Sequence, residues 1–219
     1  LELEKLFTKD EKAFYDNKKG GKGFRGVNGI DTTRKNKAIE QAKLHPIPYL
    51  CVFSLVNDCL ELIRMNNGHK KKNIQCDCIN LDGIQQEILD NGIIVKDLKW
   101  EVCKYDKNLK RYTYWDPKYD VIKEKFNLNK ANDLVWLKFT NKGHLGVVAK
   151  SFDINFNTNN SSGTLVKQVG AEWDDSFVYI FPLTDDILGN RKSGDIELVI
   201  GNYLISKGVP IIDFYSHNN

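Results

Sequence analysis

The chain has 219 residues, of which 41% are hydrophobic and 28% charged, and its formal net charge is +3 with only five prolines. This composition is typical of a globular protein, and it excludes a disordered or a fibrous chain. The length suffices for one large domain or two small ones with a buried core, and the small net charge does not by itself establish a polyanionic partner.

The sequence contains five cysteines: Cys51, Cys59, Cys76, Cys78 and Cys103. Their number is odd and no two of them have the CxxC spacing of a zinc or redox site, so we expect reduced thiols in a cytoplasmic protein. The longest apolar run, near residues 46–56, is too short to span a bilayer, and the charged start of the chain shows no export signal. We therefore expect no membrane partner.

The N-terminal third is predicted to be helical with one basic loop. Apolar residues at helical spacing predict a short helix within residues 1–15. Residues 17–30 mix glycines with lysines and an arginine, which is typical of an exposed basic loop. From Thr32, a suitable N-cap, or from the next residue, a helix is predicted to run to about Leu44, and a second, buried helix follows over residues 49–65.

The next part of the chain is predicted to alternate turns with short elements. Residues 69–73 are basic and predict a turn. Residues 83–90 predict a helix that stops at Asn91 and Gly92, and residues 93–105 have strand character.

The most informative pattern is a predicted β-hairpin. Alternating apolar residues flank a turn sequence that ends in Gly143, so residues 133–139 are expected to pair with residues 144–156. Asp133 opens the first strand and Lys150 closes the apolar run of the second. An acid and an amine held across a hairpin can place a metal ion beside a phosphate, and phosphodiester hydrolysis needs both activated water and charge neutralisation. The alternative is an ordinary solvated pair of charges at the strand ends.

The C-terminal part is predicted to complete an α/β fold. After a polar loop at 157–163 we expect strands at 164–169 and 176–182, a helix at 194–206 and a buried strand at 209–214. This order predicts a mixed central sheet flanked by helices. Residues 1–79 are expected to form a helical N-terminal region and residues 80–219 an α/β core, together making one integrated domain.

The hairpin residues resemble the PD-(D/E)xK nuclease superfamily, in particular the orthodox type II restriction endonucleases. The core of that family is helix, three strands, helix and strand, with an acid at the start of the second strand and an acid-x-Lys motif at the end of the third. Asn132-Asp133-Leu-Val-Trp matches the first element and Gly146-Val-Val-Ala-Lys150 matches the second. The resemblance implies a restriction-endonuclease-like fold in which Asp133 binds Mg²⁺ and Lys150 positions the attacking water.

The chain departs from the family at one position, because Val148 stands where the motif has its second acid. Some members take that acid from a neighbouring helix or strand, which leaves three candidates: Asp153, Glu172 and Glu124. An alternative match combines Asp82 with Asp97-Leu98-Lys99. Its spacing fits the motif better, but Asp82 is predicted to lead into a helix rather than a strand.

Two polar segments are candidates for contact with DNA. The basic loop and the helix after it supply cations for phosphates: Lys18, Lys19, Lys22, Arg25 and Arg34. The loop past the second hairpin strand supplies amides and a hydroxyl suited to base edges: Asn157, Asn159, Asn160 and Ser161. The alternatives are a plain surface loop for the first segment and an ordinary turn for the second.

Other enzyme classes find less support. The glycine-rich loop lacks the Gly-Lys-Ser/Thr of a nucleotide-binding loop, and the scattered histidines argue against a zinc hydrolase. Asp213 and His217 suggest an acid/base pair, but the buried character of the C-terminal strand favours a structural role for Asp213.

The sequence therefore favours a cytoplasmic, homodimeric, Mg²⁺-dependent type II restriction endonuclease that cleaves double-stranded DNA. A dimer follows from this function, because a palindromic site has two-fold symmetry. The length of the chain and its low-GC coding bias, seen in its abundant lysine and asparagine, suggest an A:T-rich recognition site. Two other hypotheses stay open: a nuclease-like fold that binds nucleic acid without cutting it, and a structural or protein-binding α/β domain.

Overall fold

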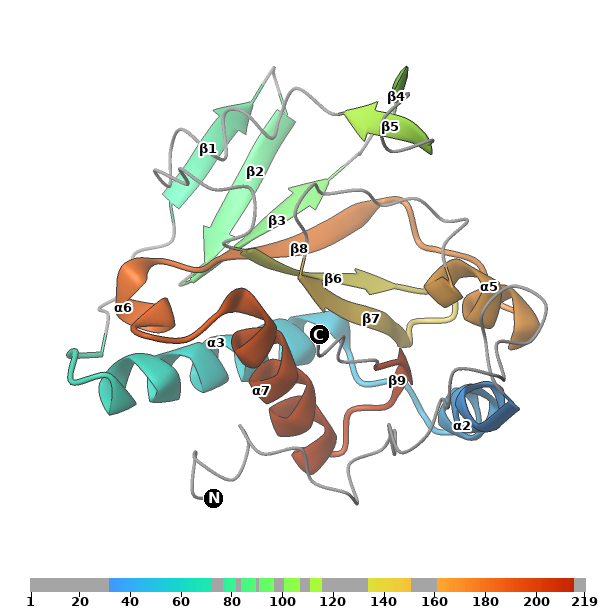
Figure 1. Cartoon of the computed structure of the whole chain (residues 1–219), viewed down its shortest axis with the longest axis horizontal. Coiled ribbons are helices and arrows are strands. Elements are labelled where there is room, and N and C mark those ends of the chain that lie inside the picture. Colours follow the sequence, from blue (N-terminus) through green and yellow to red (C-terminus); the bar gives the residue numbers. More distant parts are fainter. Residues whose placement is uncertain are drawn as a thin grey trace.

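The computed structural model describes residues 32–71, 77–81, 84–89, 91–96, 101–106, 111–115, 134–150 and 161–214. Within these ranges, seven strands form one mixed sheet with helices packed around it (Figure 1). The prediction of a mixed α/β protein is confirmed at this level. The finer prediction of a restriction-endonuclease-like arrangement stays a prediction.

The strands of the sheet lie in the order β1, β2, β3, β8, β6, β7, β9. Their bounds are β1 Asp77–Leu81, β2 Ile84–Leu89, β3 Gly92–Lys96, β8 Phe177–Pro182, β6 Leu134–Phe139, β7 Leu145–Lys150 and β9 Ile211–Asp213. Neighbouring strands are antiparallel except for β7 and β9, which are parallel. Outside this sheet, β4 Glu101–Asp106 and β5 Arg111–Trp115 form an antiparallel pair.

The described helices are α2 Thr32–Ala42, α3 Tyr49–Asn66, α5 Ser161–Gln168, α6 Asp185–Leu188 and α7 Ser193–Ser206. Helices α3 and α7 pack against each other and share a core with the central strands. Helices α2 and α5 pack against each other and against β9 (Figure 1). Hydrophobic side chains thus gather in separate clusters beside α3 and α7 and beside α2 and α5.

The hairpin of β6 and β7 stands in the middle of this arrangement. All residues of β6 are buried, because the strand lies between β8 and β7 and both of its faces are covered. Gly143, in the turn, has a φ angle of +82°, a conformation that favours glycine. Val135 pairs with Lys150, so the start of β6 and the end of β7 lie at the same end of the hairpin.

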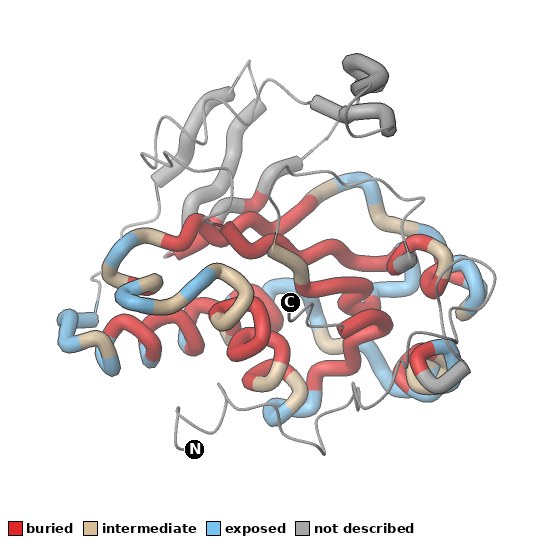
Figure 2. Tube along the Cα trace, in the orientation of Figure 1, coloured by how far each residue is buried: buried red, intermediate tan, exposed pale blue. Residues whose placement is uncertain are grey.

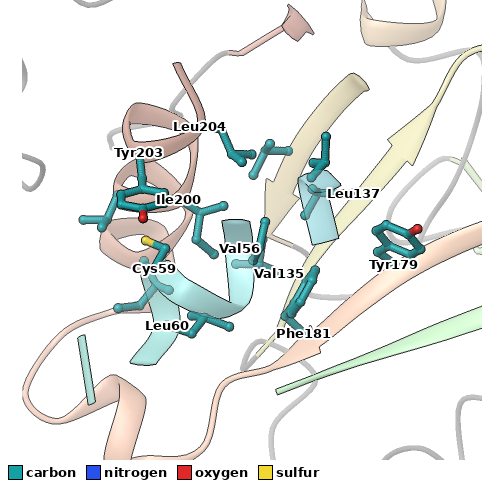
Figure 3. Packing of buried hydrophobic residues seen from close by; sticks show 14 of the residues in the cluster. Val56, Cys59, Leu60, Val135, Leu137, Tyr179, Phe181, Ile200, Tyr203 and Leu204 are labelled. Atoms are coloured by element: carbon teal, nitrogen blue, oxygen red, sulfur yellow. The ribbon is translucent and has the colours of Figure 1, made fainter. Parts of the chain in front are cut away.

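The larger hydrophobic cluster fills the space between the sheet and helices α3 and α7. Val56 and Leu60 of α3 meet Leu137 of β6 and Ile200 of α7 in this cluster, and each of the four is 0% exposed (Figure 3). Burying a side chain of this size contributes about 1.5–3 kcal/mol. Buried residues follow the central strands and the inner sides of the two helices (Figure 2). This core holds α7 against β7.

The smaller cluster joins α2 and α5 to the edge of the sheet. Ala38 of α2 packs with Leu165 and Val166 of α5 and with Ile212 of β9. Since β9 is the last strand of the sheet order, these helices cover the edge next to the hairpin.

Most of the elements with strong hydrophobic periodicity are confirmed. Helices α2, α3 and α7 begin and end within two residues of the predicted bounds. The predicted hairpin is confirmed over β6 and β7, while Asp133 and residues 151–156 of the prediction lie outside the described residues, and β8 and β9 lie within the predicted strands at 176–182 and 209–214. The predicted helix within residues 1–15 and the basic loop at 17–30 lie outside the described residues.

The predicted helix over residues 83–90 is wrong, because Ile84–Leu89 forms strand β2. This strand pairs with β1 on one side and β3 on the other, and these pairings override the weak helical pattern. Leu89 pairs with Gly92, so Asn91 belongs to a hairpin turn and does not stop a helix. The stretch predicted as one strand over residues 93–105 includes β3, which ends at Lys96, and β4, which begins at Glu101, and these two strands belong to different sheets.

The predicted strand over residues 164–169 is also wrong, because these residues belong to α5 or follow it directly. The β-branched residues Thr164, Val166 and Val169 suggested a strand. The helix instead places Leu165 and Val166 in the cluster beside α2 and β9, so tertiary packing decides the local structure.

Candidate active site

Lys150 ends β7 on the face of the sheet that α7 covers. Val148 belongs to the core beneath α3 and α7, and side chains two residues apart on a strand point to the same face. A Cβ atom at Gly194, in the first turn of α7, would lie 2.7 Å from the Nζ of Lys150. The ammonium group therefore rests against the start of α7, in space that exists because residue 194 has no side chain.

Glu197 lies one helical turn beyond Gly194 and is only 3% exposed. Its Oε2 atom is buried and has no hydrogen-bond partner. Burial raises the pKa of Glu197 to about 8, although the ammonium charge and the main-chain N–H of Lys150 act in the opposite direction. Such a carboxyl group stays largely protonated near pH 7 unless a further positive charge approaches it.

Asp213 of β9 and Arg34 of α2 form a buried ion pair within electrostatic reach of Glu197. The Nε atom of Arg34 donates to Oδ1 of Asp213 at 2.8 Å, and Nη2 donates to Oδ2 at 2.5 Å. The negative charge of Asp213 also raises the pKa of Glu197, and it has the smallest influence on that pKa. Both carboxylate oxygens of Asp213 are engaged by the guanidinium, as expected for a structural residue.

This ion pair speaks against the prediction that Arg34 contacts DNA phosphates. Arg34 is 9% exposed, and its guanidinium group faces Asp213 rather than solvent. A buried arginine already held by a carboxylate is not available to a phosphate. The sequence pattern missed the pair because its two members are 179 residues apart.

Glu172, one of the candidate second acids, lies at the wrong end of the hairpin. Its carbonyl oxygen accepts a hydrogen bond from the main-chain N–H of Asn141 at 2.9 Å, and its own N–H donates to the Asn141 side chain at 3.1 Å. Asn141 belongs to the turn, whereas Lys150 is at the far end of β7, with a rise of about 3.3 Å per residue between them. Glu172 therefore does not share a site with Lys150.

The other predicted acids, Asp133, Asp153 and Glu124, lie outside the described residues. Leu134, the residue after Asp133, opens β6 at the end of the hairpin where Lys150 lies. The metal-binding role of Asp133 stays a prediction.

Most of the predicted DNA contacts also fall outside the described ranges: Lys18, Lys19, Lys22, Arg25, Asn157, Asn159 and Asn160. Ser161 is the first residue of α5 and not part of a loop. The loop interpretation is therefore corrected at Ser161.

The alternative motif, Asp82 with Asp97 and Lys99, is not described either, but its standing changes. The sequence predicts that Asp82 leads into a helix, which counts against this motif. The residues that follow it form strand β2, which pairs with β3, and β3 ends at Lys96. The choice of Lys150 over Lys99 as the catalytic lysine therefore depends on the structural surroundings of Lys150.

Glu197 is the site residue that the sequence interpretation missed. It stands in a predicted helix between apolar neighbours, Ile196 and Leu198, and all three are buried. Glutamate is almost never fully buried unless it is paired. An acid within an apolar helix was therefore a usable signal, but nothing in the sequence connected it to Lys150.

A second group of buried charges lies between α3 and α6. Arg64 is 2% exposed and donates hydrogen bonds to Glu61, to Asp186 and, at 2.6 Å, to Asn91. The Nδ2 atom of Asn91 in turn donates to Glu61 at 2.9 Å. These bonds connect α3 to the turn between β2 and β3 and to α6.

No protein-family model, no curated protein and no solved structure matches this chain. None of the helices in the described ranges is long and apolar enough to cross a membrane. In the same ranges, no three His, Cys, Asp or Glu side chains are grouped as they would be to hold a metal ion by themselves. A function for this site therefore has to be inferred from its geometry.

Proposed function

We propose that this protein is a Mg²⁺-dependent phosphodiesterase of the type II restriction endonuclease kind, with Lys150 in its active site. The observation that carries the proposal is the position of the Lys150 ammonium group. It lies at the end of the central hairpin, against the first turn of α7 and within electrostatic reach of Glu197, whose carboxyl group has a buried oxygen with no partner.

The chemistry suits cleavage of a phosphodiester. Attack by water puts negative charge on the phosphorus oxygens and on the leaving group, and an ammonium group at a fixed position stabilises that charge. Lys150 would orient the attacking water and hold the scissile phosphate. Lys150 is positioned by the end of a strand and the start of a helix, and these elements fix its side chain more firmly than a loop would.

The described part of the site fits a hard divalent cation. Mg²⁺ takes oxygen ligands and is usually held by one or two carboxylates together with substrate phosphate oxygens. Glu197 offers a buried carboxyl oxygen with no partner. Asp133 is the other ligand that the sequence predicts. When bound, the metal would lower the pKa of a water molecule and neutralise charge on the phosphate.

The topology around Lys150 supports the proposal in part. After the hairpin of β6 and β7 the chain forms α5, β8 and α6, and then α7 and β9, which is parallel to β7. With α5, β8 and α6 set aside, this is the order of hairpin, helix and strand in the family that the sequence resembles. One difference is that the strand beside β6 is β8, which follows the hairpin in the chain instead of preceding it.

One observation favours a second function, a nucleic-acid-binding protein that does not cut. Val148 is 1% exposed and belongs to the hydrophobic core, so the position of the motif acid is occupied by an apolar side chain. A protein that had lost this acid without replacing it would bind duplex DNA but leave it intact.

Digestion of genome-scale duplex DNA by the purified protein tests the proposal. We expect discrete fragments with Mg²⁺ and no cleavage with Ca²⁺ or EDTA, because cutting needs the catalytic metal. A smear would indicate a nonspecific nuclease. Intact DNA together with salt-sensitive binding would favour the noncutting protein, and no binding at all would favour a structural or protein-binding domain.

The same digest tests the finer parts of the proposal. A palindromic site calls for a homodimer, since two identical active sites must face the two strands. Sequencing the fragment ends would give the recognition sequence, which we expect to be short, palindromic and rich in A:T pairs. Analytical ultracentrifugation would give the oligomeric state.

A further inference from the structure

We infer that Glu197 supplies the acid that the acid-x-Lys motif of this chain lacks, and that its carboxylate binds a divalent cation beside Lys150. The inference rests on the proposed function for what the cation does there. It adds the residue that holds the cation, which lies on helix α7 and not on the hairpin.

The packing around Val148 explains why the acid cannot come from the motif itself. Val148 and Lys150 are on the same face of β7, and Val148 is 1% exposed within the core that α3 and α7 cover. An ionised acid at that position would be buried among apolar side chains without a partner. Among the described elements, α7 packs against β7, so an acid on the first turns of α7 is well placed to act beside Lys150.

Helix α7 brings Glu197 to the right place. Gly194 of α7 lies against the ammonium group of Lys150, and Glu197 follows one turn later on the same side of the helix. The ammonium group and the main-chain N–H of Lys150 both act on the Glu197 carboxylate. The acid and the lysine thus lie within electrostatic reach of each other, where the end of β7 meets the first turns of α7.

Glu197 differs from the other buried acids in the described ranges. Both oxygens of Asp213 accept hydrogen bonds from Arg34, and Glu61 accepts bonds from Arg64 and Asn91. Glu197 is 3% exposed and its Oε2 atom has no partner. A buried polar atom without a partner calls for an explanation. A cation that uses this oxygen as a ligand provides one.

The test is calorimetric titration of the full chain with Mn²⁺ alone, without DNA. We expect the wild-type protein to bind Mn²⁺ and Glu197→Gln to bind it at least tenfold more weakly, because an amide is a much poorer ligand than a carboxylate. Glu172→Gln is the matched control, since it removes an acid at the other end of the hairpin, and should bind like the wild type.

Two results would overturn the inference: wild-type protein that binds no Mn²⁺, or a Glu197→Gln variant that binds it as tightly as the wild type. Glu197→Asp provides a second variant that keeps the charge but shortens its reach, and we expect intermediate affinity. Circular dichroism melting of each variant would establish that it is folded. Glutamine has nearly the shape of glutamate, so the main variant is not expected to unfold.

DNA cleavage measured on the same variants separates this inference from the proposed function. Mn²⁺ binding that depends on Glu197, without any cleavage of DNA, would overturn the nuclease proposal and leave the metal site in place. Wild-type cleavage by Glu197→Gln would overturn the role of Glu197 and leave the nuclease proposal in place.

Discussion

The two groups of buried charges in this protein differ in how they are satisfied. Arg64, between α3 and α6, donates to Glu61, Asn91 and Asp186, so its charge is matched by bonds on several sides. Glu197, in the first turns of α7, keeps one buried oxygen without a partner although the Lys150 ammonium group lies within electrostatic reach. The first group is organised as a structural connection, whereas the second keeps a buried polar atom without a partner.

The difference also concerns the elements that each group joins. The Arg64 group connects α3 to α6 and to the turn before β3, away from the hairpin. The Lys150 and Glu197 group lies where the central hairpin meets α7, at the end of the sheet where β6 begins. The fully paired Arg64 group stabilises the fold, whereas the incompletely paired group of Lys150 and Glu197 is the candidate for binding or catalysis.

The largest expected effect on stability comes from breaking the satisfied group. Arg64→Met would leave the buried Glu61 and its neighbours without their cation, and loss of one partner of a buried ion pair costs about 3–5 kcal/mol. Urea unfolding would measure this loss. Lys43→Met, at an exposed position, is the control and should change stability by about 0.5 kcal/mol or less. A loss below about 1 kcal/mol at Arg64 would remove the distinction between the two groups.

Lys150→Ala should affect cleavage rather than binding. Removing one group that stabilises transition-state charge lowers kcat about 10²–10³-fold, or about 3–4 kcal/mol of barrier. Asp133→Ala should behave in the same way. DNA affinity, measured by fluorescence anisotropy, should change little in both variants. Lys142→Ala, at the exposed turn of the same hairpin, should cut normally. A parallel fall in binding and cleavage would mean that Lys150 only holds phosphate.

Glu197→Gln should change how stability depends on pH. Burial raises the pKa of Glu197 from its ordinary value of 4.5 to about 8, so between these values the folded state holds a proton that the unfolded state has lost. The stability of the wild type should then fall as pH rises through this window, by up to about 1.4 kcal/mol per pH unit. The glutamine variant lacks this fall and should be the more stable protein at pH 8.

Urea unfolding of both proteins between pH 5 and pH 8, with EDTA present, would measure this effect. We expect the two proteins to be about equally stable near pH 5 and to differ by about 3 kcal/mol at pH 8. Curves that stay parallel across the whole range would show that Glu197 titrates normally, and the contrast with the Arg64 group would be lost.

Gly194→Ala should have the smallest effect. The new methyl group would lie 2.7 Å from the Lys150 Nζ, and the flexible lysine side chain would move to avoid it. We expect cleavage to fall about tenfold, or about 1.4 kcal/mol, while stability changes little because alanine is the better helix former. In a Lys150→Ala background the same change should have no further effect on cleavage. An equal effect in both backgrounds would show that residue 194 acts independently of the lysine.

The parts of the fold that the sequence predicted are those with strong local patterns. Helices α3 and α7 and the hairpin around Gly143 carry clear periodicity or turn chemistry. Strand β2 and helix α5 do not, and their structures are set by the strands and helices on which they pack. Local propensity alone was therefore insufficient for both.

The candidate site could be predicted only in part. Lys150 follows from its place at the end of an apolar strand. Its neighbour Glu197 is 47 positions away in the sequence, and Arg34 meets Asp213 across 179 positions. Contacts of this kind depend on how α7 and α2 pack on the sheet, which periodicity does not specify. The engagement of Arg34 with Asp213 could not be predicted for this reason.

The most direct test of the account is a crystal structure of the protein grown with Mn²⁺, with anomalous diffraction used to locate the metal. The account predicts a peak within coordination distance of a carboxyl oxygen of Glu197, roughly 2.0–2.6 Å as for other oxygen-bound divalent cations, near the Lys150 ammonium group. A map with no metal at Glu197, or with the metal held by other residues far from Lys150, would contradict it.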